Sequence, residues 1–252
     1  MILFYKEMKQ PSNIISLSGG KDSTAMVHMM IERKEPIHSI VFFDTGWEFP
    51  AMYGHINLIE KNTGIKIWRL HSRLPFEYWM SHRPIIARKG EMKGKVHRIG
   101  NGWPSISRRW CTRQKVDTLD YYSKPVENAV SCVGYAADED RGIPNSKTEI
   151  RFPLQEYGMT EKDCLEYCYS KGYHWEGLYK IFNRVSCFCC PLQRIGELRK
   201  LRKYYPSLWN KMLEMDAARP EHNRGFKGYK TVHDFERRFA NEDRLLKHYM
   251  DF

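Results

Sequence analysis

The sequence predicts an α/β fold: a parallel, helix-covered sheet, followed by a helical C-terminal extension. Short apolar runs alternate with helical patterns over the first 70 residues, and strands that alternate with helices form parallel sheets. A serine- and glycine-rich loop separates the first apolar run from the first helical pattern. We place a nucleotide-binding domain at 1–155, with a basic insertion at about 83–115, and a helical region carrying a cysteine cluster at 156–252.

The N-terminal part predicts the order β-α-β-α-β. Asn13 to Leu17 is a short apolar run, and Ser23 to Lys34 has apolar residues at helical spacing. His38 to Phe43 and Ile65 to Leu70 are two further apolar runs, with a helical pattern from about 49 to 63 between them. Because each strand is followed by a helix, we expect parallel strands that are covered on both faces.

The segment from Arg83 to Lys115 has a different composition. It contains ten Lys or Arg residues, one acid (Glu91) and four glycines. This composition predicts a mobile basic insertion. The apolar run from Asn128 to Tyr135 then predicts a return to the core sheet.

The C-terminal third predicts helices. Thr160 to Asp163 matches a capping box, and the helix that it starts should end at Gly172. From Leu192 apolar residues recur at helical spacing, and Thr231 to Asp234 predicts the cap of a last helix. The polar face of the helix after Leu192 holds Arg194, Arg199, Lys200, Arg202 and Lys203.

Composition limits the class of protein. The 252 residues are 42% hydrophobic, which is enough for one substantial core and a smaller lobe. The formal net charge of +11 favours a polyanionic partner, with nucleic acid first among the candidates and a merely solvated basic surface as the alternative. No run of about 18 apolar residues occurs, and the first ten residues lack the order of a secretory signal. We therefore expect a cytoplasmic protein with no membrane partner.

The loop after the first strand has the features of a phosphate-binding loop. It reads Ser18-Gly19-Gly20-Lys21-Asp22-Ser23. A glycine pair between a strand and a helix lets successive N–H groups point at one anion, and the helix dipole adds positive potential. Lys21 supplies a full charge and the two serines supply hydroxyls. A carboxylate beside a phosphate is costly unless it holds a cation, so Asp22 predicts a Mg²⁺ ion that bridges it to the phosphates.

The cysteines predict a metal centre more than disulfides. Of seven cysteines, Cys187, Cys189 and Cys190 fall within four residues, and Cys187 and Cys190 form a CxxC pair. Thiolate ligation suits an iron–sulfur cluster or zinc, which spacing cannot separate. Two alternatives are that Cys189 or Cys190 is a free thiol and that the three cysteines are structural without a metal. The remaining cysteines other than Cys111 are expected in the core: Cys132, Cys164 and Cys168.

Four elements in one order resemble a known family. After the loop, Phe43 to Pro50 reads FDTGWEFP, Arg109 to Lys115 reads RWCTRQK, and Gly134 to Arg141 reads GYAADEDR. This order resembles the PP-loop ATP pyrophosphatase superfamily, in its phosphoadenylylsulfate (PAPS) reductase-like branch. With the cysteines, the pattern is most similar to the ATPase subunit of DNA phosphorothioation systems. The resemblance implies an adenine nucleotide alpha hydrolase-like domain.

The resemblance also implies roles for particular residues. ATP would be held by the 18–23 loop together with Asp44, Thr45 and Gly46, and Lys21, Asp22 and Arg141 would act in catalysis. The alternative for Asp44 is a turn-forming role before Thr45 and Gly46. The alternative for Arg141 is an ion pair with Asp138 or Glu139. A [4Fe-4S] cluster, with zinc as the alternative, would be bound by Cys111, Cys187, Cys189 and Cys190.

The function implied by this resemblance is cleavage of ATP to AMP and pyrophosphate, which adenylylates a substrate for sulfur transfer. The acceptor would be nucleic acid, either DNA or tRNA, and the sulfur donor a protein such as a cysteine desulfurase. One alternative is a PAPS or adenylylsulfate reductase. Those enzymes resemble one another in a C-terminal catalytic cysteine, whereas no cysteine follows Cys190 here. Another alternative is a non-catalytic, zinc-stabilised nucleic-acid-binding protein.

Aromatic residues lie in or near the basic segment. Trp79, Trp103 and Trp110 are interleaved with Lys and Arg, a combination that suits single-stranded or looped nucleic acid. The alternative is that these residues clamp ATP and shield the metal centre.

Overall fold

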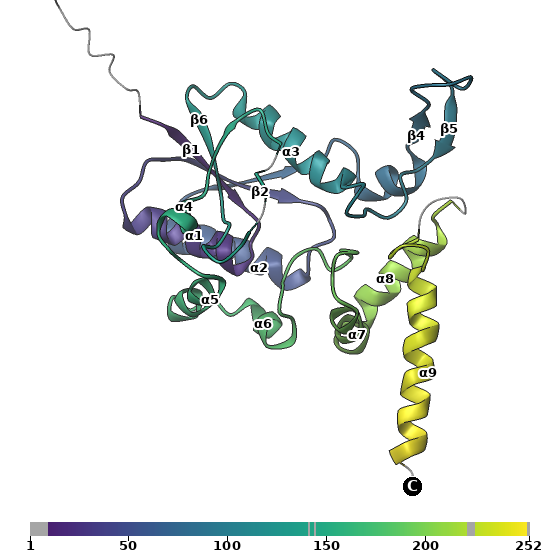
Figure 1. Ribbon diagram of the computed structural model, residues 1–252. Coiled ribbons are helices and arrows are strands. Elements are labelled where there is room, and N and C mark those ends of the chain that lie inside the picture. Colours follow the sequence, from purple (N-terminus) through teal and green to yellow (C-terminus); the bar gives the residue numbers. More distant parts are fainter. Residues whose placement is uncertain (1–9, 141, 144, 221–224, 251–252) are drawn as a thin grey trace, which may run out of the picture.

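A five-stranded parallel sheet forms the centre of the protein (Figure 1). The computed structural model describes residues 10–140, 142–143, 145–220 and 225–250. The strand order is β3-β2-β1-β6-β7, and every neighbouring pair is parallel. The strands are β1 Ser12–Leu17, β2 Ile37–Asp44, β3 Ile67–His71, β6 Ala129–Val133 and β7 Glu149–Arg151. The predicted parallel sheet is thereby confirmed.

Helices cover both faces of this sheet. The first three long helices are α1 Lys21–Glu32, α2 Pro50–Thr63 and α3 Trp110–Ser123. Figure 1 shows α1 and α2 on one side and α3 on the other. The first two crossovers lead away from β1 in one direction and the third returns past it, so right-handed crossovers place α3 on the opposite face.

The chain after β7 is helical. Its elements are α4 Pro153–Glu156, α5 Glu161–Ser170, η2 Trp175–Gly177, α6 Leu178–Ile181, α7 Ile195–Tyr204, α8 Pro206–Ala217 and α9 Val232–Met250. Thr160 and Asp163 form the predicted capping box of α5. Thr231 and Asp234 do the same before α9, where the Thr231 N–H donates to Asp234 Oδ2 at 2.7 Å. No helix in the described part of the chain is both long and apolar enough to traverse a bilayer.

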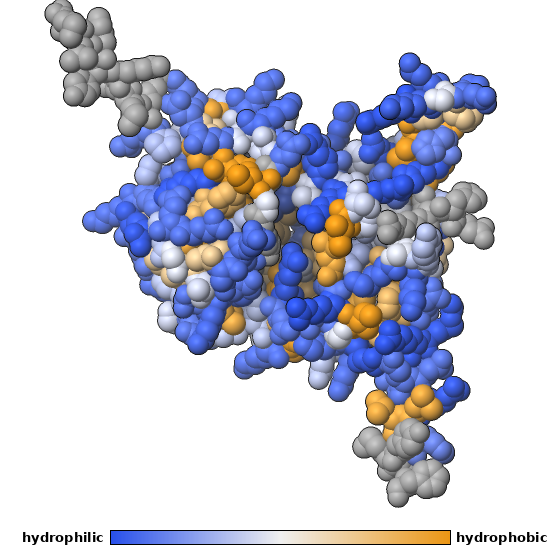
Figure 2. All heavy atoms as spheres, in the orientation of Figure 1, coloured by the Kyte–Doolittle hydropathy of each residue, from blue (hydrophilic) through white to orange (hydrophobic). Residues whose placement is uncertain are grey.

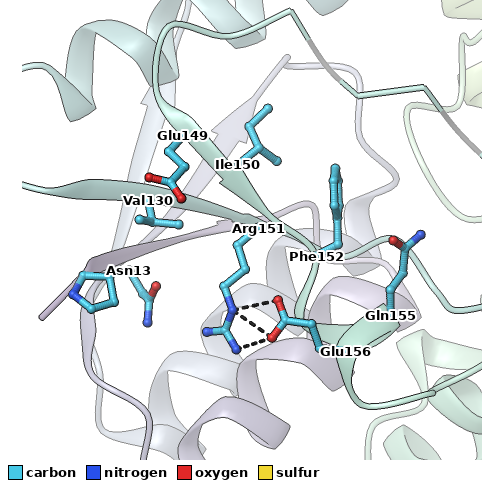
Figure 3. A pocket seen from close by; sticks show the side chains of 9 residues that line it. Asn13, Val130, Glu149, Ile150, Arg151, Phe152, Gln155 and Glu156 are labelled. Carbon is cyan, nitrogen blue, oxygen red and sulfur yellow. Dashed lines mark hydrogen bonds and ion pairs between the residues drawn. The ribbon is translucent and has the colours of Figure 1, made fainter.

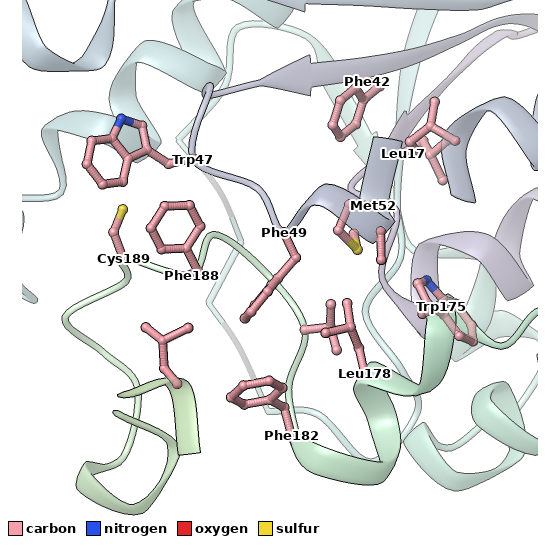
Figure 4. Close-up of a cluster of buried hydrophobic side chains, with 14 of the residues drawn as sticks. Leu17, Phe42, Trp47, Phe49, Met52, Trp175, Leu178, Phe182, Phe188 and Cys189 are labelled. Atoms are coloured by element: carbon pink, nitrogen blue, oxygen red, sulfur yellow. The ribbon is translucent and has the colours of Figure 1, made fainter. Parts of the chain in front are cut away.

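One hydrophobic core joins the sheet to the C-terminal region (Figure 4). Leu17 and Phe42 come from the sheet, and Trp47 and Phe49 from the loop after β2. They pack with residues far along the chain, each at most 3% exposed: Trp175, Leu178, Phe182, Phe188 and Cys189. The segment that contains Cys187, Cys189 and Cys190 is therefore packed against the loop after β2.

The basic insertion differs from the expected mobile loop. The short π-helix η1 (Tyr78–His82) leads into β4 (Pro84–Ile86) and β5 (Val96–Ile99), which pair as an antiparallel ribbon apart from the main sheet. The last six residues of the segment begin α3. Gly90 and Gly94 take positive φ values of 72° and 82° that close the turn of the ribbon. The base is fixed where the Gly100 N–H donates to the Arg83 carbonyl at 2.7 Å.

Candidate functional site

The phosphate loop lies where the chain reverses direction across the sheet. From β1 the chain proceeds to β2 on one side and later to β6 on the other, and ligands of open α/β sheets bind at such a switch point, beyond the carboxyl ends of the strands. The loop joins the end of β1 at Leu17 to the start of α1 at Lys21. Gly19 has a φ of 78°, which favours glycine.

The loop is closely packed against β6. A Cβ atom on Gly134, the first residue after β6, would lie 3.0 Å from both the backbone N and Cα of Ser23. The Ser18 and Ser23 hydroxyl oxygens are 2.9 Å apart, and the Ser18 N–H donates to Ser23 Oγ at 3.1 Å. These contacts fix the curled backbone that an anion-binding loop requires.

Lys21 is buried and paired with two carboxylates. Its side chain is 8% exposed, and Nζ lies 2.7 Å from Asp22 Oδ1 and 2.8 Å from Glu161 Oε2. Burial alone would lower the pKa of Lys21, but the two carboxylates outweigh it and raise the pKa above its ordinary value. The ammonium group is therefore charged. Sequence reasoning missed Glu161, although it is the first residue after the recognised cap Thr160.

Two aromatic residues from the C-terminal region close over the loop. The Tyr179 hydroxyl accepts the Lys21 N–H at 2.8 Å, and Trp175 Nε1 donates to the Gly19 carbonyl at 2.8 Å. Burial raises the pKa of Tyr179 above its ordinary value. No sequence signal connected residues 175–179 with a loop more than 150 positions earlier, because only the tertiary fold brings them together.

The residues after β2 form a turn beside the loop. Asp44 Oδ1 accepts the Gly46 N–H at 2.7 Å and the Tyr53 hydroxyl at 2.9 Å. These hydrogen bonds give Asp44 the turn-forming role that is the alternative to nucleotide binding. Thr45 Oγ1 donates to Glu48 Oε1 at 2.8 Å. Because Leu17 and Phe42 are register partners in parallel strands, both turns lie at the same edge of the sheet.

The segment after β6 carries the fourth element of the pattern. Asp138 Oδ1 accepts the Glu161 N–H at 2.8 Å, which places this segment against the start of α5. Arg141 lies outside the described residues, so its predicted catalytic role stays a prediction.

The four candidate cysteines lie in one neighbourhood. They are free thiols. Burial and the neighbouring thiols raise the pKa of Cys187 and Cys189 well above the ordinary value, and the pKa of Cys111 is raised by burial and by Cys190. Cys187 Sγ also donates to Glu48 Oε1 at 3.3 Å. Sequence reasoning did not find Glu48, although it lies within the FDTGWEFP element.

The four thiols are of the chemical type that binds iron–sulfur clusters or zinc, but they are not close enough together to form a metal-binding group. Among the described residues, no three His, Cys, Asp or Glu side chains are grouped so that they could hold a metal ion. The assignment of Cys111, Cys187, Cys189 and Cys190 as ligands therefore stays a prediction. Cys132, Cys164 and Cys168 are at most 1% exposed, which confirms their expected place in the core.

Two cavities lie away from the phosphate loop. One, of about 420 Å³, is lined by residues of β7 and α4, and there Arg151 pairs with Glu156 (Figure 3). Its cation is neutralised by carboxylates, since Arg151 also pairs with Glu35. The other lies along the end of α3. Figure 2 shows a separate hollow between the sheet and the C-terminal helices, bordered largely by hydrophilic residues.

The fold and the loop define an α/β nucleotide-binding protein, with a lysine and a glycine turn at the switch point of the sheet. The chain belongs to the phosphoadenosine phosphosulfate reductase domain family, whose model matches residues 12–193. The matched region includes the 18–23 loop and the four candidate cysteines, Cys111, Cys187, Cys189 and Cys190.

Curated relatives occur in Methanocaldococcus jannaschii. Two uncharacterized proteins of this organism are 25% and 24% identical to the chain over 229 and 230 residues, which are 82% and 84% of it. The chain spans 42% and 50% of their lengths, about half of each relative.

Two solved structures are similar to this chain at low sequence identity. A PAPS reductase from Candida auris, in a phosphate complex, is 14% identical with a TM-score of 0.48, covering 70% of this chain and 81% of that one. The U34-tRNA thiolase NcsA from Methanococcus maripaludis, with its [4Fe-4S] cluster, is 15% identical with a TM-score of 0.40, covering 91% and 82%. The family assignment rests on the family model and on the phosphate loop.

Proposed function

We propose that this protein binds ATP in the 18–23 loop and cleaves it between the α- and β-phosphates to adenylylate an acceptor. The observation that carries the proposal is the loop itself, in which the buried Lys21 ammonium lies at the start of α1, where N–H groups and the helix dipole attract phosphate. Asp44, Thr45 and Gly46 at the neighbouring strand end would bind the rest of the nucleotide.

The proposed reaction uses positioned charge more than covalent chemistry. An oxygen of the acceptor, or of water when no acceptor is bound, attacks the α-phosphorus, the bond from that phosphorus to the bridging oxygen breaks, and pyrophosphate leaves. Lys21 and the N–H groups at the start of α1 stabilise the charge that develops on the pyrophosphate. Asp22 would hold the Mg²⁺ ion that neutralises part of this charge. Glu161 and the phosphates would then compete for the Lys21 ammonium.

The acceptor in this proposal is nucleic acid, DNA or tRNA, which fits the net charge of +11. A sulfur nucleophile from a donor protein, such as a cysteine desulfurase, would displace AMP from the adenylylated acceptor. Cys111, Cys187, Cys189 and Cys190 would hold the [4Fe-4S] cluster, which supplies a site for sulfur when bound. The resemblance to DNA phosphorothioation ATPases supports DNA as the acceptor.

A second candidate is reduction of a sulfonucleotide. The family model supports it, because the matched domain is named after PAPS reductase. The loop would then hold the phosphates of the sulfonucleotide instead of ATP. A non-catalytic, zinc-stabilised nucleic-acid-binding protein is the third candidate, and it predicts binding without turnover.

One assay separates the three candidates. Anaerobically purified protein is incubated with Mg²⁺ and ATP labelled in the α-phosphate, alone and with duplex DNA or tRNA, and AMP and pyrophosphate are quantified. A parallel reaction with PAPS or adenylylsulfate and a dithiol measures sulfite. We expect pyrophosphate in an amount equal to the sum of free AMP and label bound to the polymer, and a loss of all these products in Lys21→Ala. Sulfite from the sulfonucleotide, with no AMP or pyrophosphate from ATP, would establish the reductase, and no product in either reaction would overturn the enzymatic proposal.

A further inference from the structure

The structure distinguishes the two basic segments. On α7, the Arg202 guanidinium lies 2.9 Å from Glu236 and 2.5 Å from Asp243, both on α9. Arg199 pairs with Glu242 of α9, and Lys200 with Glu197 at 2.8 Å. The charges at the centre of the α7 basic face are thus neutralised within the protein.

The β4–β5 ribbon, residues 84–99, carries charge that is not neutralised in this way. Figure 1 shows the ribbon projecting from the body of the protein. Its one acid is Glu91. Within the described residues, no carboxylate lies at ion-pair distance from any of the cations of the ribbon and its base, whereas the later Arg113 pairs with Asp117 at 2.7 Å. These cations are Arg83, Arg88, Lys89, Lys93, Lys95, Arg98, Arg108 and Arg109.

Two arginines of like charge are neighbours at the base of the ribbon. Arg98 lies on β5 opposite Ile85, and Arg108 closes a tight turn in which it exchanges backbone hydrogen bonds with Ser105 at 3.1 and 3.2 Å. The Nε of Arg98 is buried and, within the described structure, has no hydrogen-bond acceptor. Burial and the charge of Arg108 lower the pKa of Arg98. An anion bound between the two guanidinium groups would relieve their repulsion and accept this N–H.

The tryptophans near this segment are engaged in packing. Trp103 is 1% exposed, Trp110 Nε1 donates to the Gly102 carbonyl at 3.0 Å, and the Arg83 guanidinium lies 4.5 Å from the ring centre of Trp79. Residues 84–99 contain no Phe, Tyr or Trp. The ribbon therefore offers cations and aliphatic side chains, but no ring of these three types on which an unpaired base could stack.

We propose that the β4–β5 ribbon and the Arg98–Arg108 pair form a docking surface for the phosphate backbone of double-stranded DNA. A two-stranded ribbon fits the major groove of B-form DNA, whereas side chains cannot read the deep, narrow major groove of A-form RNA. Arg108 and Arg109 lead directly into α3, which carries Cys111, so a duplex on the ribbon lies beside the candidate site. This inference rests on the proposed function only in taking nucleic acid as the acceptor.

The test measures binding apart from turnover. Fluorescence anisotropy is recorded without ATP for a labelled 25-base-pair DNA of mixed sequence, the same single strand and the corresponding RNA duplex, over a range of salt. The variant Lys93→Glu/Lys95→Glu changes two cations of the ribbon. Lys61→Glu/Lys124→Glu makes the same charge change at exposed positions on α2 and at the end of α3. Thermal unfolding confirms that both variants fold.

We expect the ribbon variant to bind duplex DNA at least about tenfold more weakly at 0.1 M salt. The slope of log affinity against log salt concentration should be shallower, because about two fewer counterions are released from the DNA. The control should lose less than about threefold, the share due to net charge alone. Equal losses in both variants, tighter binding of the single strand or of RNA, or no binding of any polymer by the wild type would each overturn the docking surface. ATP cleavage without polymer should stay unchanged in the ribbon variant, so failure of the docking surface and failure of the proposed reaction are distinguishable.

Discussion

Lys21 Nζ and Glu161 Oε2 lie 2.8 Å apart, although 140 positions separate them in the chain. This ion pair connects the phosphate loop with the start of α5. The hydrogen bond from Lys21 holds the pKa of Glu161 below its ordinary value, so the carboxylate is charged and competes with phosphate for the same ammonium. The loop is thus observed in a state in which its lysine is occupied by the protein's own carboxylates.

Removing this competing charge should tighten ATP binding. We expect Glu161→Gln to lower the Kd for ATP by about threefold to fivefold, the size expected of a half-exposed ion pair. Glu166→Gln is the matched control, because Glu166 lies on the same helix and is exposed. Isothermal titration calorimetry with a non-hydrolysable ATP analogue gives both values. Weaker binding in Glu161→Gln would show instead that Glu161 supports the nucleotide or its magnesium ion.

The close approach of β6 to the loop predicts a strict requirement for glycine at position 134. A methyl group in Gly134→Ala would meet the Ser23 backbone at 3.0 Å, so we expect a loss of about 1–3 kcal/mol in the free energy of unfolding and weaker ATP binding. Gly196→Ala, where a Cβ has no neighbour within 4 Å, should show neither effect. Urea unfolding and ATP titration measure the two quantities. Wild-type values for Gly134→Ala would mean that the loop has room to shift.

The cysteine assignment predicts a specific loss of metal. Anaerobically purified wild-type protein should contain iron and sulfide and absorb visible light. Replacement of Cys111 or Cys187 by serine should abolish both properties, because each would remove one thiolate ligand. Cys164→Ser, in the core, should retain them. A colourless wild-type protein that contains zinc would contradict the iron–sulfur assignment and favour the zinc alternative.

Buried His55 predicts loss of stability in mild acid. Burial lowers the pKa of His55 to about 3, and its Nε2 is 2.9 Å from Thr24 Oγ1. Below pH 6.5 the unfolded chain takes up a proton here and the folded chain does not, so stability should fall by about 1.4 kcal/mol per pH unit between pH 6 and 4. His55→Gln should reduce this slope in urea unfolding, and His38→Gln, at an exposed position, should leave it unchanged. Equal slopes in all three proteins would contradict the prediction.

The pairing of α7 with α9 predicts a structural role for Arg202. Arg202→Ala should cost about 1 kcal/mol or more of unfolding free energy, since it leaves Glu236 and Asp243 without their cation. It should not change DNA affinity beyond the effect of one unit of net charge. Lys203→Ala, an exposed neighbour on α7, provides the comparison in both measurements. A loss of DNA binding confined to Arg202→Ala would place the polymer on α7 instead of on the ribbon.

The sequence predicted those parts of the fold whose cause is local. β1 was expected at 13–17 and spans Ser12–Leu17, and α2 was expected at about 49–63 and spans Pro50–Thr63. Apolar periodicity and the Thr160 capping box carry this information within a few residues. The ribbon was missed because β4 and β5 are only three and four residues long, and the five cations among residues 84–99 obscured their pattern. The helix α3 was missed for a related reason, since its first turn follows directly from the basic segment.

The candidate site was predictable only in part. Ser18 to Ser23 and the FDTGWEFP element are continuous in the sequence, and the structure places both at the carboxyl edge of the sheet. Tyr179, Trp175 and Glu161 contact the loop through tertiary packing, for which no local pattern exists. The ion pairs between α7 and α9 could not be predicted for the same reason, because the partners on α9 become apparent only when the two helices are placed side by side.

Trp103 joins three parts of the protein at the base of the ribbon. Its Nε1 donates to Asp216 of α8 at 2.8 Å, and its ring lies 6.5 Å from that of Trp47 and 5.0 Å from that of Phe226. The base of the ribbon is therefore held by the core, while residues 84–99 extend beyond it. Because the hydrophobic core includes none of residues 84–99, the length and sequence of this arm can change without disturbing the packing around the 18–23 loop. Under the proposed function, exchange of this short hairpin would alter the choice of acceptor and leave ATP binding unchanged.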